Sequence, residues 1–244
     1  MSGIVRITLR RPEKQNALDR ETVRRIREEL DAAARDPESR VVILAAEGKD
    51  FCSGADLSEL RRIRDSPILE NLDDARFLGD LFLEMRRHPL PIVAAVRGRA
   101  LAGGCGLATA ADLVFASETA RFGYPEVNIG FVPAMVMAIL RRNVSEKRAF
   151  ELLVTGKVID AAEALHVGLV NELHADSGLD AAVDAFAARM AARPAQAVKL
   201  TKRLLYHMDS MAFEAALHAG AQTNAIARMT EDCRKGVDEF LKKE

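Results

Sequence analysis

Apolar residues in the first half of the chain gather in four short runs, and the middle ones are almost uninterrupted. The runs span residues 4–9, 41–46, 92–96 and 112–116. An uninterrupted apolar run of this length is typical of a strand that is covered on both faces. Between the first two runs, Val23, Ile26 and Leu30 form an apolar stripe among charged residues, which predicts an amphipathic helix over 20–35. Strands that alternate with helices indicate a parallel sheet with right-handed crossovers.

Helical patterns dominate the rest of the chain, and strands almost stop after about residue 133. Two helices are predicted before that point, over 57–64 and 70–87, with a break near Ser66 and Pro67. The later helical patterns span 134–142, 145–154, 160–166, 178–192, 194–208, 212–228 and 230–243. The last of these are alanine-rich and amphipathic, so we expect them to form the outer layer of the domain or an oligomer interface.

Composition and charge narrow the class of protein. With 244 residues, of which 49% are hydrophobic, the chain can form one large domain, or one domain with a helical extension. The net charge of −1 provides no field that attracts nucleic acid or an anionic membrane surface. No apolar run approaches the 18 or so residues that span a bilayer, and the N-terminus leads straight into a strand pattern. With three scattered cysteines, these features predict a soluble cytoplasmic enzyme without a disulfide framework.

Three segments that follow predicted strands should lie together, because parallel strands end at the same edge of a sheet. They read GKDFCSGADLSE (48–59), RGRALAGGCGLA (97–108) and SETARFGYPEVNIG (117–130). The first two carry glycines and open into helices, whose N-termini present unpaired N–H groups. Glycines such as Gly103 and Gly104 let a phosphate or an oxyanion approach those groups. The alternative is that they serve only tight packing of a helix against a strand.

Glu126 is the only carboxylate in the stretch RFGYPEVNIG, and Pro125 fixes the backbone just before it. A carboxylate at the mouth of a largely apolar site can have a raised pKa and act as a general base or acid. The alternative is a solvated glutamate in a loop. Other chemistry is weaker: Cys52 has no histidine placed by the sequence to activate it, and the histidines lack the spacing of a metal site.

The three loops together resemble the crotonase family, the enoyl-CoA hydratases and isomerases. The matching stretches are GKDFCSGADL, GRALAGGCGLATAAD and RFGYPEVNIG, with VRITLRRPEKQNAL before them and LLVTGKVIDAAEALHVGLVN after them. The resemblance covers nearly the whole chain. It implies an α/β fold, a crotonase-like spiral of β-β-α units over 1–190, followed by a C-terminal α-helical trimerisation region over 191–244. The expected assembly is a homotrimer or a hexamer.

The resemblance also implies a site and a substrate. The backbone N–H groups of Ala55 and Gly103 match the family's oxyanion hole for the enolate of a CoA thioester, and Glu126 matches a proton-transferring glutamate. Coenzyme A is then part of the substrate, an acyl-CoA, and no metal or redox cofactor is expected. The residues expected beside the substrate are Ser53, Gly54, Asp56, Gly104, Gly106, Lys14 and Lys242, with Phe77, Leu81 and Phe131 lining an acyl pocket or, alternatively, only filling the core.

One position departs from the family's hydratase pattern. Hydratases generally carry a second glutamate at the position of Gly106, so the carboxylate pair that handles water is broken here. Hydration activates water at one carbon and protonates another, whereas one base can shift a double bond through an enolate. The sequence therefore slightly favours an isomerase. Hydration with Glu126 as the only catalytic carboxylate remains open, as does a non-catalytic CoA-fold scaffold or RNA-binding protein.

Several cations and one aspartate carry weaker signals. The chain ends in FLKKE, where relatives usually continue, and Lys242 and Lys243 either reach a CoA phosphate or form a solvated basic end. Arg11 and Lys14, in the loop after the first strand, are further candidates for contacts with the phosphates. Asp112, in AADLVFA, is expected to have a structural role at the start of a strand.

Overall fold

The computed structural model describes residues 3–242, apart from the side chain of Leu57, and contains two sheets within that range. The main sheet is entirely parallel, in the order β1 (Ile4–Leu9), β2 (Val41–Ala46), β3 (Ile92–Val96), β5 (Leu113–Ser117) and β8 (Glu172–His174). The smaller sheet joins β4 (Arg99–Leu101), β6 (Arg121–Gly123) and β7 (Val158–Asp160), with β4 parallel and β7 antiparallel to β6. The four predicted strands are confirmed, and the short ones were not predicted.

Every helix that the apolar pattern predicts is formed, with its ends within about two residues of the expected ones. The helices are α1 (Arg20–Arg35), α2 (Leu57–Asp65), α3 (Ile68–Arg87), α4 (Gly103–Ala110), α5 (Ala134–Asn143), α6 (Glu146–Thr155), α7 (Ala161–His166), α8 (Leu179–Ala191), α9 (Ala195–His207), α10 (Phe213–Arg228) and α11 (Glu231–Leu241). Short 3₁₀ turns lie at η1 (Pro12–Lys14), η2 (Pro125–Ile129) and η3 (Met208–Ser210). None of the helices in this part of the chain is long and apolar enough to cross a membrane.

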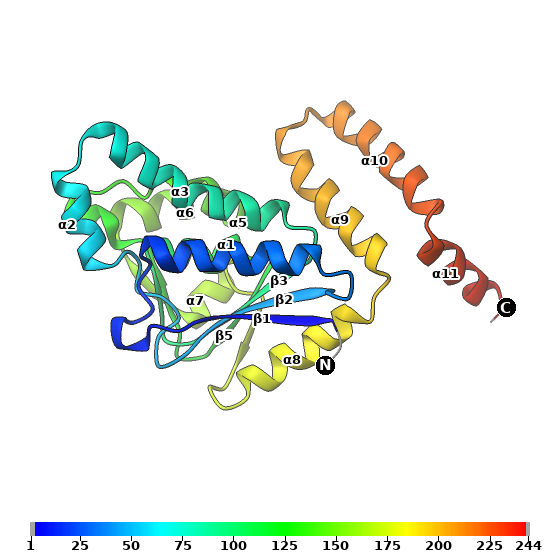
Figure 1. Cartoon of the computed structure of the whole chain (residues 1–244), viewed down its shortest axis with the longest axis horizontal. Helices are drawn as coiled ribbons and strands as arrows, with labels where there is room; N and C mark the ends of the chain where they lie inside the picture. The colour runs from blue at the N-terminus through cyan, green and yellow to red at the C-terminus, as the bar shows by residue number, and fades with distance from the viewer. Residues whose placement is uncertain (1–2, 243–244) are drawn as a thin grey trace.

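Helices cover both faces of the main sheet, which explains why β2 is apolar throughout. Val41, Ile43 and Ala45 belong to a cluster with α8, whose buried residues include Leu179, Val183 and Ala187. Val42 and Leu44 face the larger core instead, which α1, α3 and α4 help to form. Figure 1 shows α8 on one side of the sheet and α1 and α3 on the other. Neither face of β2 therefore meets water.

A buried ion pair fastens α9 to this core. The ammonium of Lys202 donates to Asp112 Oδ2 at 2.7 Å and to two backbone carbonyls, and burial lowers its pKa. Asp112 also accepts from the backbone N–H of Ile92, at the start of β3, and from the hydroxyl of Tyr206. The structural role expected for Asp112 is thus confirmed.

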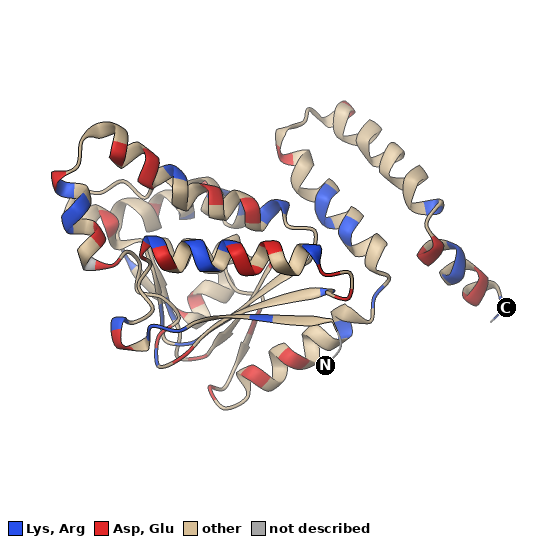
Figure 2. Ribbon diagram, in the orientation of Figure 1, with Lys and Arg blue, Asp and Glu red and all other residues tan. Residues whose placement is uncertain are grey.

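Beyond α9 the chain leaves the core. In Figure 1, α10 and α11 extend away from the sheet, and neither helix contains a buried residue. Figure 2 shows that α10 carries few charged residues, whereas α1 carries many acidic and basic residues along its length. In α10 the carboxylate and guanidinium side chains are those of Glu214 and Arg228, and the helix also contains His218. Its exposed side chains include the apolar residues Phe213, Leu217 and Ile226.

Candidate active site

A cavity of about 710 Å³ lies where the three predicted loops meet. Ala55 comes from the loop after β2, Gly103 from the start of α4, and Glu126 from η2, and all three line the cavity. Helices α1, α2, α3 and α5 supply the remaining walls. The structure therefore brings together residues that stand far apart in the sequence, at the edge of the sheet where ligands bind in parallel folds.

The backbone around Ala55 is fixed by a short parallel pairing with Leu18. The N–H of Leu18 donates to the carbonyl of Gly54 at 2.7 Å, and the N–H of Asp56 donates to the carbonyl of Leu18 at 2.9 Å. Successive peptide groups of an extended chain point in opposite directions. The N–H of Ala55 therefore points away from Leu18, and Ala55 itself lines the cavity.

A second set of backbone donors lies at the start of α4. Ala102 precedes the helix with φ +51° and ψ −127°, and no side chain caps it. The first N–H groups of a helix have no acceptor within it, so the N–H of Gly103 is available to a ligand. A Cβ on Gly54 would lie 3.0 Å from the Cβ of Ala102, so the segment carrying Ala55 touches the one carrying Gly103. The two segments that carry these backbone donors thus meet at the cavity.

The glycines of α4 differ in what surrounds them. A Cβ on Gly104 would lie 2.4 Å from the carbonyl oxygen of Cys52, and one on Gly106 would lie 2.3 Å from Cγ1 of Val136. These two glycines allow close packing and do not line the cavity. A Cβ on Gly103 would make only ordinary contacts, at 3.6 Å from side-chain atoms of Leu18 and Leu78. Of the three, Gly103 is the one that lines the cavity.

Glu126 is the carboxylate that the cavity leaves without a cation. Its side chain is half-buried, Oε2 has no hydrogen-bond partner among the described residues, and burial raises its pKa. Asp19, Glu59 and Asp74 also line the cavity, but each is paired with an arginine. A carboxylate with a raised pKa and no fixed partner is suited to taking up and returning a proton.

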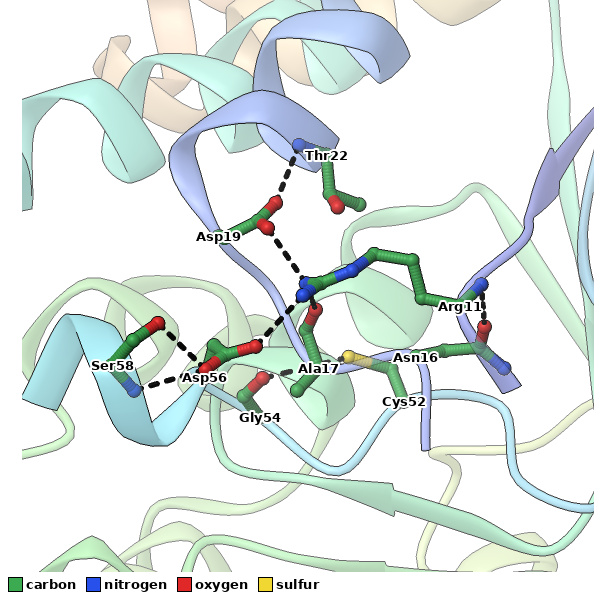
Figure 3. A network of polar contacts seen from close by, with 9 residues as sticks. All are labelled: Arg11, Asn16, Ala17, Asp19, Thr22, Cys52, Gly54, Asp56 and Ser58. Carbon is green, nitrogen blue, oxygen red and sulfur yellow. Dashed lines mark hydrogen bonds and ion pairs between the residues drawn. The ribbon is translucent and has the colours of Figure 1, made fainter. Parts of the chain in front are cut away.

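Arg11 and Asp56 hold the loops of the site together but do not line the cavity (Figure 3). The Arg11 guanidinium contacts Asp19 at 2.8 Å and Asp56 at 2.9 Å. Asp56 also accepts from the N–H and the hydroxyl of Ser58 at the start of α2, and these hydrogen bonds, with Arg11, lower its pKa to about 2. Asp56 was expected beside the substrate, and Arg11 as a cation for phosphates. Both are instead engaged in joining η1, α1 and α2.

The other predicted residues divide between the cavity, the core and the surface. Ser53, Phe77 and Phe131 line the cavity, whereas Leu81 was expected there and is fully buried in the core. Gly54 lies behind the cavity wall, against Ala102. The two lysines, Lys14 on η1 and Lys242 after α11, are exposed and lie outside the cavity lining, and Lys243 lies beyond the described residues.

Several wall residues were not predicted. Arg20, Leu60, Ile63, Asn71, Leu78, Ile129 and Met135 line the cavity as well. Leu60 and Ile63 stand three residues apart on a predicted helix, so helical spacing would have identified them as one face beside the site. Asn71 and Met135 carry no such signal, because their position depends on how α3 and α5 pack.

The geometry does not prepare Cys52 as a nucleophile. Cys52 is completely buried, and burial raises the pKa of its thiol to about 12, so the reactive thiolate is not populated at neutral pH. Across residues 3–242, no group of three or more histidine, cysteine, aspartate or glutamate side chains is arranged to hold a metal ion.

The architecture is that of the crotonase fold, as solved structures of the same shape demonstrate. A crystal structure of enoyl-CoA hydratase from Mycobacterium smegmatis matches with a TM-score of 0.94 at 36% identity, over 99% of this chain and 93% of that one. A Thermus thermophilus protein named "Putative enoyl-CoA hydratase" is 40% identical over 97% of this chain and 94% of its own length. The 2,3-dehydroadipyl-CoA hydratase of Escherichia coli is 33% identical over 98% of this chain and 92% of its own length.

The model of the enoyl-CoA hydratase/isomerase family matches residues 1–244. The chain belongs to this family and is an enzyme of it.

Proposed function

We propose that the protein shifts the carbon–carbon double bond of an unsaturated acyl-CoA from the β,γ to the α,β position. The observation that carries the proposal is the lone carboxylate: Glu126 has no cationic partner within residues 3–242, while Val136 fills the space beside Gly106. The thioester oxygen is held by the N–H groups of Ala55 and Gly103. Coenzyme A belongs to the substrate, and the reaction needs no metal or redox cofactor.

One carboxylate is enough for the whole proton balance. The Glu126 carboxylate removes a proton from Cα, and the electron pair moves into the thioester to give a dienolate. The two N–H groups stabilise the charge that develops on oxygen, and one such donor typically contributes about 10²–10³ in rate. Protonated Glu126 then returns the proton at Cγ, so the double bond lies between Cα and Cβ and the carboxylate is regenerated. The raised pKa of Glu126 makes it a stronger base than an ordinary glutamate.

Hydration is the second candidate, and the relatives favour it. The Escherichia coli relative is named as a hydratase of 2,3-dehydroadipyl-CoA, and other similar proteins carry hydratase names. In that reaction Glu126 alone activates water for attack on Cβ and supplies the proton to Cα. A non-catalytic scaffold or an RNA-binding role is not favoured, because two open N–H groups and an unpaired carboxylate share one cavity.

A paired assay separates the two reactions. The purified protein is given a 3-enoyl-CoA and, separately, a trans-2-enoyl-CoA of the same chain length, and the absorbance of the conjugated thioester is followed. We expect strong gain of absorbance with the first substrate and little loss with the second. Rapid loss with the second and no gain with the first would replace the isomerase by a hydratase. No change of absorbance with either substrate would exclude enoyl-CoA as the substrate.

We also propose that the protein assembles as a homotrimer or hexamer through its C-terminal helices. The proposal rests on α10 and α11, which contain no buried residue yet expose Phe213, Leu217, Ile226, Val237 and Phe240, and Met229 between them is exposed too. Apolar surface of this extent is usually covered by a partner. Light scattering should give three or six times the 26.7 kDa of one chain. A mass of one chain at micromolar concentration would contradict the proposal.

A further inference from the structure

The peptide of Ala55 is oriented by an isolated bridge between two loops. The bridge pairs Ala55 with Leu18 and lies outside the strands of both sheets. The N–H of Leu18 donates to the carbonyl of Gly54, and the N–H of Asp56 donates to the carbonyl of Leu18. An isolated bridge lacks the adjoining ladder hydrogen bonds that fix two strands of a sheet relative to each other. The direction of the Ala55 N–H therefore depends on contacts made on either side of the bridge.

One side chain, that of Arg11, makes such contacts with both segments of the bridge (Figure 3). Its Nη1 donates to the carbonyl of Ala17 at 2.8 Å, one residue before Leu18. Its Nη2 donates to Oδ2 of Asp56 at 2.9 Å, one residue after Ala55. The guanidinium thus ties together the two segments that form the bridge.

The partners of Arg11 are fixed by further hydrogen bonds. The side chain of Asp56 is only 6% exposed, and its Oδ1 accepts from the N–H and the hydroxyl of Ser58. Nη1 of Arg11 also contacts Oδ2 of Asp19, whose other oxygen accepts from the N–H of Thr22 and caps α1. Charge-assisted hydrogen bonds are stronger than neutral ones. A planar guanidinium can bond in several fixed directions at once, which the ammonium of a lysine does not reproduce.

We propose that Arg11 is a positioning residue for the oxyanion hole: it holds residues 54–56 against Leu18, so that the N–H of Ala55 points at the thioester oxygen. Arg11 does not line the cavity, so it acts on the substrate through the backbone. The proposal rests on the oxyanion hole of the proposed function. If it holds, loss of the Arg11 contacts weakens the polarisation of the thioester carbonyl more than it weakens substrate binding.

The test is the infrared stretching frequency of the thioester carbonyl in bound butanoyl-CoA, labelled with ¹³C at that carbon. Hydrogen bonds to the oxygen weaken the C=O bond, so binding to the wild-type protein should lower the frequency. This saturated thioester has no double bond to shift or hydrate, so the spectrum does not depend on turnover. We expect a smaller lowering with Arg11→Lys than with the wild type. An equal lowering in both proteins would overturn the proposal.

Steady-state kinetics provide a second readout for Arg11→Lys. We expect kcat to fall about 10–100-fold, since a displaced donor loses part or all of the roughly 10²-fold contribution of one donor. KM should change by less than about threefold, because the rest of the cavity is unaltered. A purely structural role would lower the stability to urea and leave both kcat per folded molecule and the carbonyl frequency unchanged. That result would overturn the proposal.

Two further variants make the test specific. Arg10→Lys is the matched control, because the side chain of Arg10 is 65% exposed and pairs with Glu47, so both readouts should stay at wild-type values. Asp56→Asn keeps the size of the side chain and weakens the contact with Arg11 from the other side, so it should reduce the lowering as well. Combining Asp56→Asn with Arg11→Lys should add little to the larger single effect. Fully additive effects would show that the two residues act separately, and would overturn the proposal.

The same spectra distinguish this proposal from the proposed function. If butanoyl-CoA fails to bind the wild-type protein, or binds without a lowered carbonyl frequency, the oxyanion hole and the role of Arg11 are both overturned. If the lowering is present and is unchanged in Arg11→Lys, only the role of Arg11 is overturned. If the lowering depends on Arg11 but no enoyl-CoA is converted, the proposed reaction fails while the role of Arg11 stands.

Discussion

Replacing Glu126 by glutamine should lower kcat by about 10²–10⁴-fold, the range of a lost general acid–base group. Glutamine keeps the size of the side chain and cannot take up a proton. KM should change little, because the N–H groups of Ala55 and Gly103 hold the thioester in both proteins. For the wild type, activity should fall as the pH drops through the raised pKa of Glu126, since the base must be ionised to act. Steady-state kinetics across pH give both results.

The same substitution should not destabilise the fold at pH 7. The folded-state pKa of Glu126 is above its unfolded value, so its favourable contribution is present at low pH and is lost as pH rises through the folded pKa. Above that pH the wild type keeps an ionised, partly buried carboxylate, and glutamine removes this cost. Urea unfolding at neutral pH should therefore show equal or higher stability for the variant.

Glu118→Gln provides the matched control. Glu118 is an exposed residue just after β5, so its substitution should leave both activity and stability close to wild type. Undiminished turnover by Glu126→Gln would remove Glu126 from its role as the base. A large loss of stability in that variant would make it a structural residue instead.

Restoring the second carboxylate by Gly106→Glu should lower the free energy of unfolding by at least about 3 kcal/mol and should not create a hydratase. The new Cβ alone would lie 2.3 Å from Cγ1 of Val136 and 3.1 Å from the ring of Phe82. Such overpacking typically costs about 1–3 kcal/mol, and a carboxylate in an apolar core adds several more. Position 106 therefore lacks a glutamate, and the packing of Val136 and Phe82 around it leaves no room for one. Denaturant unfolding measures the stability, and the paired assay measures hydration.

Smaller substitutions test whether the contact between residue 106 and Val136 causes the expected loss of stability. Gly106→Ala should cost about 1–3 kcal/mol, and combining it with Val136→Ala, which removes the clashing methyl, should recover much of that loss relative to Val136→Ala alone. Gly103→Ala is the control at the start of the same helix, where the new Cβ finds ordinary contacts and little stability should be lost. A well-folded Gly106→Glu protein that hydrates enoyl-CoA would contradict this explanation.

Local patterns predicted most of the fold. The uninterrupted apolar run of β2 and the apolar stripe of α1 each span enough residues to be recognised in the sequence. Strands such as β4 and β6 have three residues each, too few to display an alternation. They form because their neighbours in the smaller sheet pair with them, which is a property of the folded chain.

The site was predicted less completely than the fold. Which residues line the cavity depends on contacts with other segments, and the sequence around each residue does not reveal those contacts. Gly103 and Gly106 look alike in the sequence. Only the folded structure shows that Gly103 lines the cavity beside Leu78, whereas Gly106 packs against Val136. Phe77 and Leu81 stand four residues apart on one face of α3, so helical spacing assigns them the same environment. The packing of α3 then buries Leu81 and leaves Phe77 at the cavity.

The central claim is that Glu126 alone carries the proton from Cα to Cγ, and isotope transfer tests it most directly. A 3-enoyl-CoA with two deuterium atoms at Cα is converted in ordinary water under single-turnover conditions, and the product is analysed for deuterium at Cγ. Because Glu126 Oε2 is shielded within the protein, exchange with water should be slow, and a large share of the product should carry one deuterium at Cγ. A product with only hydrogen at Cγ would show that water or another group delivers that proton, and would contradict the single-carboxylate mechanism.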